Sequence, residues 1–362
     1  MNRLDLYLGK SILSATLLAG LVVAVLEAAF TFLGQLGDIG DGEYGLGQAL
    51  QYSLLVLPAR VYQSFPMIVL LGALIGLGGL AARKELDVFR LAGCSDSRLV
   101  RSVLITGLPL ILLVYLLGEG VVPPAWESAT RLRTTAMYED VQLQGGHEFW
   151  VRSGNRFILV DSTTVDGHLA DLTVFEVANG ARLQAVLAVG QARFEDSIWH
   201  LQDIRETRFT KEQVLAQYRQ GDRWSRLMNP ELASLLWRDP SGLTLPELAR
   251  YMDYLKGNGA DISVYRLSWW QRLAAPVSVL AMLLLSLGFV LCSGGPRKTG
   301  RRVLTGIFVG LAFKLVNDIS AHAGLVYGMP PYVSALLPSL LVLLPALGMM
   351  PGAAVSRLKR SR

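Results

Sequence analysis

Residues 273–292 read LAAPVSVLAMLLLSLGFVLC, an uninterrupted run without a charged side chain. A helix that rises about 1.5 Å per residue needs about 20 mainly apolar residues to cross the roughly 30 Å hydrocarbon core of a bilayer. Runs that pass the same test lie on both sides of a long polar insert, at residues 11–33, 61–82, 103–122, 303–319 and 332–350. The sequence therefore predicts a membrane α-helical bundle of six transmembrane helices, three before the insert and three after it.

The basic residues are distributed unevenly between the two ends of these spans. Lys and Arg concentrate in the N-terminal segment, in the loops that follow the second and fourth spans, and in the last residues of the chain. The loops at 34–51 and 324–331 contain neither. Because short loops rich in Lys and Arg stay cytoplasmic, we expect both termini in the cytoplasm and the insert in the periplasm. The net charge of +5 thus reports topology and does not point to nucleic-acid binding.

The insert has the pattern of a β domain. Between about 142 and 226 the apolar runs give way to short alternating segments, as in Ala185, Leu187 and Val189. Alternation is typical of strands, and Asn179-Gly180 between two such runs predicts a hairpin turn. About seven or eight strands fit, which predicts an all-β domain and leaves a sandwich, roll or barrel open. Both cysteines are expected on the cytoplasmic side, so packing and not disulfides must stabilise this domain.

An amphipathic helix is predicted after the strands. Thr244 and Glu247 form a capping box, and the apolar residues behind it recur at helical spacing, at Leu248, Tyr251, Met252 and Leu255. We expect this helix to lie along the outer membrane face. The chain then divides into transmembrane helices 1–3 (1–135), a periplasmic β domain (136–240), the amphipathic helix with a linker (241–265), and transmembrane helices 4–6 with a cytoplasmic tail (266–362).

The cytoplasmic loop at 84–93 has the pattern of a short amphipathic helix. Leu86, Phe89 and Ala92 fall on one side, and Gly93 is available to end the helix. One interpretation is an interfacial turn anchored by its basic residues. The other is a docking element for a soluble partner, in which Glu85 and Asp87 meet basic residues and Phe89 is the buried anchor.

Several separated motifs resemble the LptF/LptG family of lipopolysaccharide export permeases, particularly its G-type members. They are Phe65-Pro66-Met67, the run 71–78 (LGALIGLG), Glu85-Leu86, Ala92-Gly93, the run 325–328 (LVYG), Pro330-Pro331 and the run 335–338 (ALLP). The resemblance covers essentially the whole chain. It implies an inner-membrane protein with six spans and a β-jellyroll in the periplasm. It also implies assembly with an F-type permease, a dimeric cytoplasmic ATPase and a single-span periplasmic bridge protein. The cargo would be lipopolysaccharide.

The same resemblance assigns the helix at 84–93 as the coupling helix that enters a groove of the ATPase. Its contact residues would be Glu85, Leu86, Asp87, Phe89 and Arg90. The chain has no G-x-x-x-x-G-K-[S/T] phosphate loop, so ATP would be used by the separate ATPase, and we expect no cofactor in this chain.

Catalytic and metal-binding patterns are weak. His147-Glu148 would begin a zinc-protease motif, but position 151 is Val151 instead of a second histidine. The four histidines have no ligand spacing, so no catalytic and no metal-binding residue is predicted. A membrane enzyme is disfavoured for this reason. An F-type paralogue and a non-transporting scaffold that regulates a periplasmic partner stay as alternatives to a G-type permease.

Three arginines at the outer ends of the spans are candidates for contacts with lipid phosphates. They are Arg60, Arg131 and Arg133, and a guanidinium pairs with phosphate through two parallel hydrogen bonds. The alternative is ordinary interfacial snorkelling. By resemblance Arg133 matches a basic position of G-type relatives, whereas Thr31, Gly37 and Asp38 occupy the region where relatives have lysines.

Ionisable residues also lie inside two of the spans. Glu27 is in the first, and Lys314 and Asp318 are in the fifth. Because a bare charge in hydrocarbon is costly, each needs a partner. Lys314 could pair with Asp318 one turn away, or Glu27 could meet Lys314, face the lumen or stay protonated.

Gly72 and Gly76, four residues apart, predict close helix packing.

Overall fold

The computed structural model describes residues 3–137, 149–153, 156–163, 169–178, 182–195, 198–209, 213–224, 240–257, 261–292 and 299–349. Residue contacts divide the chain into two compact units. The helical unit comprises Met1–Gly34, Ser53–Trp126 and Ser263–Arg362, and the β-containing unit comprises Gln35–Tyr52 and Glu127–Ile262. The loop after the first span therefore belongs to the same unit as the strands.

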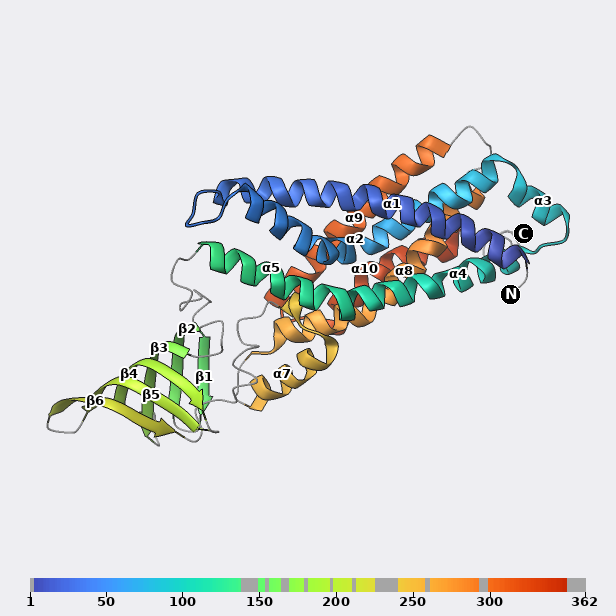
Figure 1. Ribbon diagram of the computed structural model, residues 1–362. Helices are drawn as coiled ribbons and strands as arrows, with labels where there is room; N and C mark the ends of the chain where they lie inside the picture. The colour runs from blue at the N-terminus through green and yellow to red at the C-terminus, as the bar shows by residue number, and fades with distance from the viewer. Residues whose placement is uncertain are drawn as a thin grey trace. The chain divides into compact units, whose positions relative to one another are not determined.

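The helical unit is built from long apolar helices, of which α2 and α5 extend into the β-containing unit (Figure 1). In chain order the helices are α1 (Arg3–Gln35), α2 (Leu46–Ala82), α3 (Glu85–Leu91), α4 (Asp96–Leu116), the π-helical segment η2 (Leu117–Val121), α5 (Val122–Met137), α8 (Ser263–Cys292), α9 (Thr299–Val326) and α10 (Pro331–Gly348). A short 3₁₀ turn, η1 (Leu36–Asp38), follows α1. Several of these helices continue past the apolar runs, because hydropathy marks only the stretch that lies at lipid depth.

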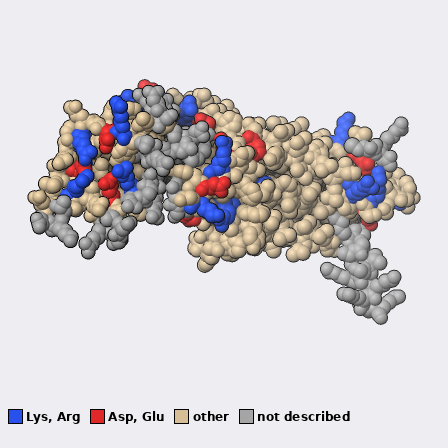
Figure 2. Space-filling model, turned by 90° about the horizontal axis from the view of Figure 1, so that it is seen from below, with Lys and Arg blue, Asp and Glu red and all other residues tan. Residues whose placement is uncertain are grey.

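Six helices in the described part of the chain are long and apolar enough to cross a membrane, which confirms the six predicted spans. Figure 2 shows the surface that this produces: an uncharged stretch of the bundle lies beside an end where Lys, Arg, Asp and Glu gather. The exposed apolar side chains include Leu17 on α1 and Phe308 on α9, which are 78% and 64% exposed. Exposure on this scale indicates a surface made for hydrocarbon or for another protein.

The close approach of α1 and α2 depends on two glycines, as their spacing predicted. A Cβ atom at Gly72 would lie 2.3 Å from the Cα atom of Thr16, and one at Gly76 would lie 2.7 Å from the carbonyl oxygen of Ser11. The Ser11 hydroxyl also donates a hydrogen bond to the Gly76 carbonyl at 3.2 Å. The two backbones therefore touch where no side chain intervenes, which is how apolar helices associate in a membrane.

Substitution of Gly72 tests this packing. We expect Gly72→Ala to lower the free energy of unfolding in detergent by roughly 1–3 kcal/mol, because the new methyl group has to displace the α1 backbone. Gly79→Ala is the matched control, since a Cβ atom there meets nothing within 4 Å. Thermal unfolding of both variants measures the difference, and equal stabilities would show that α1 does not pack this way.

The described strands form one antiparallel sheet in sequential order (Figure 1). They are β1 (Phe149–Ser153), β2 (Arg156–Thr163), β3 (Leu169–Ala178), β4 (Arg182–Glu195), β5 (Ile198–Phe209) and β6 (Val214–Trp224). The predicted hairpin is confirmed by the pairing of β3 with β4, whereas its turn at Asn179-Gly180 lies outside the described residues. The all-β nature of the insert is thus confirmed, and the jellyroll expected from the resemblance stays a prediction.

One face of the sheet is buried. Its side chains include Ile158, Val160, Leu172, Val174, Ala185, Leu187, Val189, Trp199, Leu201 and Ile204, all 5% exposed or less. The alternation in β4 that predicted a strand therefore sets its inward face, through Ala185, Leu187 and Val189. The strand β6 differs, since nearly all of its residues are exposed.

The inward face changes phase at one level in three neighbouring strands, and in β3 the buried positions step from Leu169 to Leu172. The buried positions step from Val189 to Ala192 in β4 and from Leu201 to Ile204 in β5. Gly190 and Asp203 lie opposite each other at this step, and Asp203 has a φ of 57°. The Tyr218 hydroxyl of β6 donates to the Asp203 carboxylate at 2.8 Å, and this hydrogen bond raises the pKa of the phenol. The shift keeps apolar side chains inward on both sides of the step.

The amphipathic helix is confirmed as α7 (Leu245–Gly257), after a short 3₁₀ turn η3 (Pro240–Gly242). The capping box forms as predicted: the Thr244 N–H donates to Glu247 at 2.8 Å, and the Glu247 N–H donates to the Thr244 hydroxyl at 3.4 Å. The apolar stripe is covered by protein, because Leu248 and Tyr251 are at most 2% exposed and Tyr254 packs against the core of the sheet. The location of this helix along the outer membrane face stays a prediction.

Candidate functional site

The helix α3, which the charge distribution predicts to be cytoplasmic, is fixed to the bundle by side chains that were expected to contact a partner. Leu86 is 4% exposed and belongs to the core formed by the long helices. The Tyr7 hydroxyl of α1 donates to Glu85 at 2.7 Å, and the rings of Tyr7 and Phe89 meet edge to face with centroids 6.4 Å apart. Lys84 before the helix has a φ of 60°, a left-handed conformation that turns the chain sharply after α2.

Two ion pairs secure α3 and α1 to the start of α4. Arg90 at the end of α3 pairs with Asp96 at 2.8 Å. Asp5 of α1, only 5% exposed, pairs with Arg98 at 3.3 Å and accepts a hydrogen bond from Ser102. Sequence analysis missed Asp5, because a single acid beside basic residues gives no periodic signal. The three helices are therefore linked at one end of the bundle.

The outward face of α3 contains one residue of the predicted set and two residues outside it. Asp87 is exposed, and Val88 and Leu91 are 59% and 88% exposed. Within the predicted set, Leu86 and Phe89 face the chain's own bundle, whereas Asp87 faces away from it. Any protein that docks here would first meet Asp87, Val88 and Leu91.

The intramembrane charges form one cluster between three helices. The Lys314 ammonium of α9 lies 3.4 Å from the Glu27 carboxylate of α1, and the Ser64 hydroxyl of α2 donates to the same carboxylate oxygen at 2.7 Å. Asp318 is exposed, and among the described residues it forms no ion pair with Lys314. Of the alternatives, the structure thus has Glu27 paired with Lys314.

A second buried ion pair was not found from the sequence. Arg272 of α8, whose side chain is 8% exposed, pairs with Glu119 at 3.0 Å. Glu119 lies in the π-helical segment η2, where a Cβ atom at Gly118 would lie 2.7 Å from the ring of Tyr62. Single extra-wide turns of this kind often occur at functional sites. The pair ties the helix that leads into the insert to the helix that leads out of it.

The arginines proposed for lipid phosphates differ in their surroundings. Arg133 pairs with Asp38 at 2.7 Å and lies over the ring of Tyr52. Arg131 pairs with Glu127 at 3.2 Å. Asp38 therefore already neutralises Arg133 within the chain. Arg60, in contrast, is exposed, and no ion pair of it occurs in the described part of the helical unit.

Tyr44 lies close to the Arg133 pair, in the loop that follows α1. Its side chain is 1% exposed, and its hydroxyl donates to Gln35 at 3.0 Å. Burial raises the pKa of this phenol, while the nearby Arg133 charge opposes the rise. The loop is thus packed around a neutralised arginine.

Within the described residues no group of three or more His, Cys, Asp or Glu side chains could hold a metal ion.

The sequence profile described as "Lipopolysaccharide export system permease LptF/LptG" matches residues 6–351. The chain belongs to the LptF/LptG family. It is 34% identical over 342 residues to the lipopolysaccharide export system permease protein LptG of Escherichia coli (strain K12), covering 93% of this chain and 94% of that protein. It is 32% identical over 343 residues to the protein of the same name from Haemophilus influenzae, covering 94% and 96%.

Membership of the LptF/LptG family confirms the resemblance seen in the separated motifs. Both relatives carry the G-type name, as the motifs indicated. With six apolar helices, the chain is a multi-pass membrane protein of the lipopolysaccharide export permease family. Neither the contacts of α3 nor those of the arginines follow from membership, so their roles stay proposals.

A double-mutant cycle tests the intramembrane cluster. We expect Glu27→Leu and Lys314→Met to show a coupling energy of roughly 0.5–3 kcal/mol in detergent unfolding, because each single change leaves the other charge without its partner. The matched cycle of Asp318→Leu with Lys314→Met should give a coupling near zero. Larger coupling in the second cycle would mean that Lys314 pairs within its own helix.

Proposed function

We propose that this chain is the G-type permease subunit of an ATP-driven transporter that extracts lipopolysaccharide from the inner membrane and passes it to a periplasmic β bridge. A separate dimeric ATPase supplies the energy from the cytoplasm, and an F-type permease completes the membrane channel. A single-span bridge protein receives the cargo in the periplasm. The observation that carries the proposal is the anchored helix α3, joined to a family match over nearly the whole chain.

The contacts of α3 support a role in coupling. A helix that transmits the movement of a motor has to be tied firmly to the helices that respond. Glu85 accepts a hydrogen bond from Tyr7 of α1, and Arg90 forms an ion pair with Asp96 of α4. The exposed side, with Val88 and Leu91, offers the apolar contact that a groove on the ATPase needs. Movement of α3 is thereby passed to two membrane helices at once.

The uncovered sides of α1 and α9 support the proposal that a second permease packs against this chain. In their most apolar windows only 28% and 17% of the residues are buried, against 67% in α2. Glu27 and Lys314 belong to these same two helices, and the Lys314 side chain is 39% exposed. A half-exposed ion pair facing hydrocarbon would be costly. These helices therefore suit a surface that faces the second permease or a polar path for the cargo.

The β domain supports the handover of an acyl cargo. Its inward face presents branched and aromatic side chains such as Val174, Leu187 and Trp199. Acyl chains need an apolar lining of this kind to leave the membrane, while the sugar stays in water. The exposed strand β6 offers a place where a β domain of another protein can add strands.

Substitution of the exposed leucine of α3 tests the docking of the ATPase. We expect Leu91→Asp to reduce copurification of the ATPase at least tenfold, because a buried carboxylate without a partner opposes association. Ser97→Asp, also exposed at this end of the chain, is the control and should retain the ATPase. Retention by both variants would exclude Leu91 from the contact.

Glu85 tests coupling apart from docking. Glu85→Arg should abolish lipopolysaccharide release from proteoliposomes that contain the whole complex while ATP hydrolysis continues. Tyr7→Phe removes only the internal hydrogen bond to Glu85, so its effect isolates the structural share of any loss. A loss of equal size in Tyr7→Phe would limit Glu85 to positioning α3, and unchanged release in Glu85→Arg would remove it from coupling.

The same proteoliposomes separate transport from the alternatives. A permease releases lipopolysaccharide to the bridge protein only when ATP is present, whereas a scaffold leaves the cargo in the membrane. Mass spectrometry of the native complex identifies which second permease accompanies this chain. Pairing with a G-type permease would make this chain the F-type subunit instead.

A further inference from the structure

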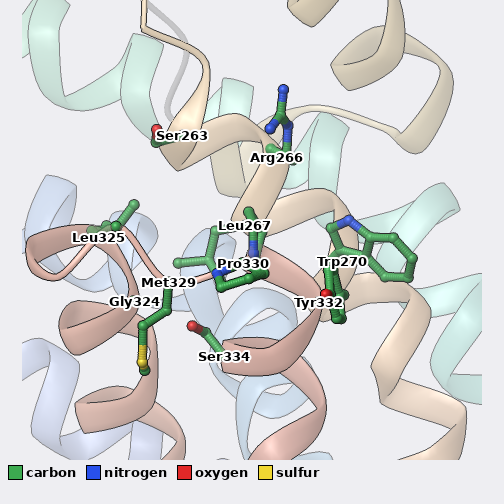
Figure 3. A pocket seen from close by; sticks show the side chains of 12 residues that line it. Ser263, Arg266, Leu267, Trp270, Gly324, Leu325, Met329, Pro330, Tyr332 and Ser334 are labelled. Carbon is green, nitrogen blue, oxygen red and sulfur yellow. The ribbon is translucent and has the colours of Figure 1, made fainter.

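A cavity lies at one end of the helical unit, apart from the clusters described so far. Its volume is about 460 Å³, and it is bounded by the N-terminal end of α8, the C-terminal end of α9 and the N-terminal end of α10. Figure 3 shows its walls: Trp270 and Tyr332 lie on one side, and Leu325 and Met329 on the other. Both sides are thus largely apolar, whereas polar groups occupy only a few places.

The lining contains a buried hydroxyl group without a partner. Ser334 is 1% exposed, and within the described residues its Oγ atom has no hydrogen-bond partner. In Figure 3 this hydroxyl points from α10 toward Gly324 and Met329. A Cβ atom at Gly324 would lie 2.2 Å from it, so only glycine leaves room there. A buried hydroxyl without a hydrogen bond is costly, and a ligand in the cavity can supply the missing bond.

Arg266 supplies a positive charge at the cavity. It is exposed at the side of the cavity opposite Ser334 (Figure 3), and no ion pair of it occurs in the part of the chain that the structure describes. The N-terminal end of α10, at Pro330 to Tyr332, also lines the cavity and adds the partial positive charge of a helix N-terminus. Among the lining residues there is no Asp or Glu. The electrostatics therefore favour one anionic group.

The position of the cavity indicates which kind of molecule carries the anionic group. The three helices around the cavity are long and apolar enough to cross a membrane. Trp269 and Trp270, which pack edge to face with centroids 5.3 Å apart, are typical of the boundary between hydrocarbon and water. We propose that this cavity binds the headgroup of an anionic glycerophospholipid of the phosphatidylglycerol type. Arg266 contacts the phosphodiester, Ser334 contacts a headgroup oxygen, and the acyl chains follow the apolar helix surface. This lipid is distinct from the exported cargo.

The chemistry of the lining also separates this lipid from others. Phosphatidylethanolamine carries an ammonium group, for which the lining has no carboxylate. Lipid A carries two phosphate groups, whereas a single cationic side chain lines the cavity. A headgroup with one phosphodiester and uncharged hydroxyl groups matches both conditions.

Lipid titration of the purified, delipidated full-length chain, followed by native mass spectrometry, tests the site. We expect Arg266→Gln to weaken phosphatidylglycerol binding about tenfold, because a charge-assisted hydrogen bond is lost. Arg101→Gln, an exposed arginine of α4, is the matched control and should bind normally. Unchanged binding in Arg266→Gln would overturn the proposal.

Ser334→Ala separates binding from folding. Because the hydroxyl has no hydrogen-bond partner among the described residues, its removal should leave the melting temperature of the lipid-free protein unchanged or higher. Phosphatidylglycerol binding should nevertheless fall about threefold. Equal affinity for phosphatidylethanolamine, or displacement of the lipid by inorganic phosphate or by lipopolysaccharide at equal concentration, would overturn the assignment of the occupant. These outcomes leave the transport proposal unaffected, because none of them measures export.

Discussion

The structure depends on the neutralisation of charge inside an apolar bundle. Glu27 is held between Lys314 and Ser64, and Glu119 is held by Arg272. Hydrocarbon offers no water to stabilise a lone ion, so these pairs determine which helices lie together more strictly than apolar packing does. The glycine contacts between α1 and α2 then bring the helices close enough for the pairs to form.

Much of the fold was predictable, because length and periodicity carry physical information. Six spans followed from the thickness of the hydrocarbon core, and the start of α7 followed from the reciprocal bonds of Thr244 and Glu247. The inward face of the sheet was not predictable as a whole. The step at Gly190 and Asp203 shifts the alternation by one residue, and no local pattern announces that neighbouring strands make the same shift.

The candidate site was predictable in part, for a related reason. The sequence placed Glu85 and Asp87 on a short helix but could not tell that Glu85 faces Tyr7, which is 78 residues away. It located Glu27, Lys314 and Asp318, yet the choice of partner depends on helix rotation. Arg272 and Glu119 were missed because the end of a span ordinarily carries charges, so only the burial of Arg272 identifies the pair.

The shared step in β4 and β5 has a mechanical consequence. Gly190 and Asp203 interrupt the pairing of β4 and β5 at the same level, while regular pairing continues on either side. The sheet can therefore bend along this line. The angle between its two parts can change while the strands stay paired. Under the proposed function, a β domain of this construction would adjust its width to the acyl chains of the cargo while its strands stay paired.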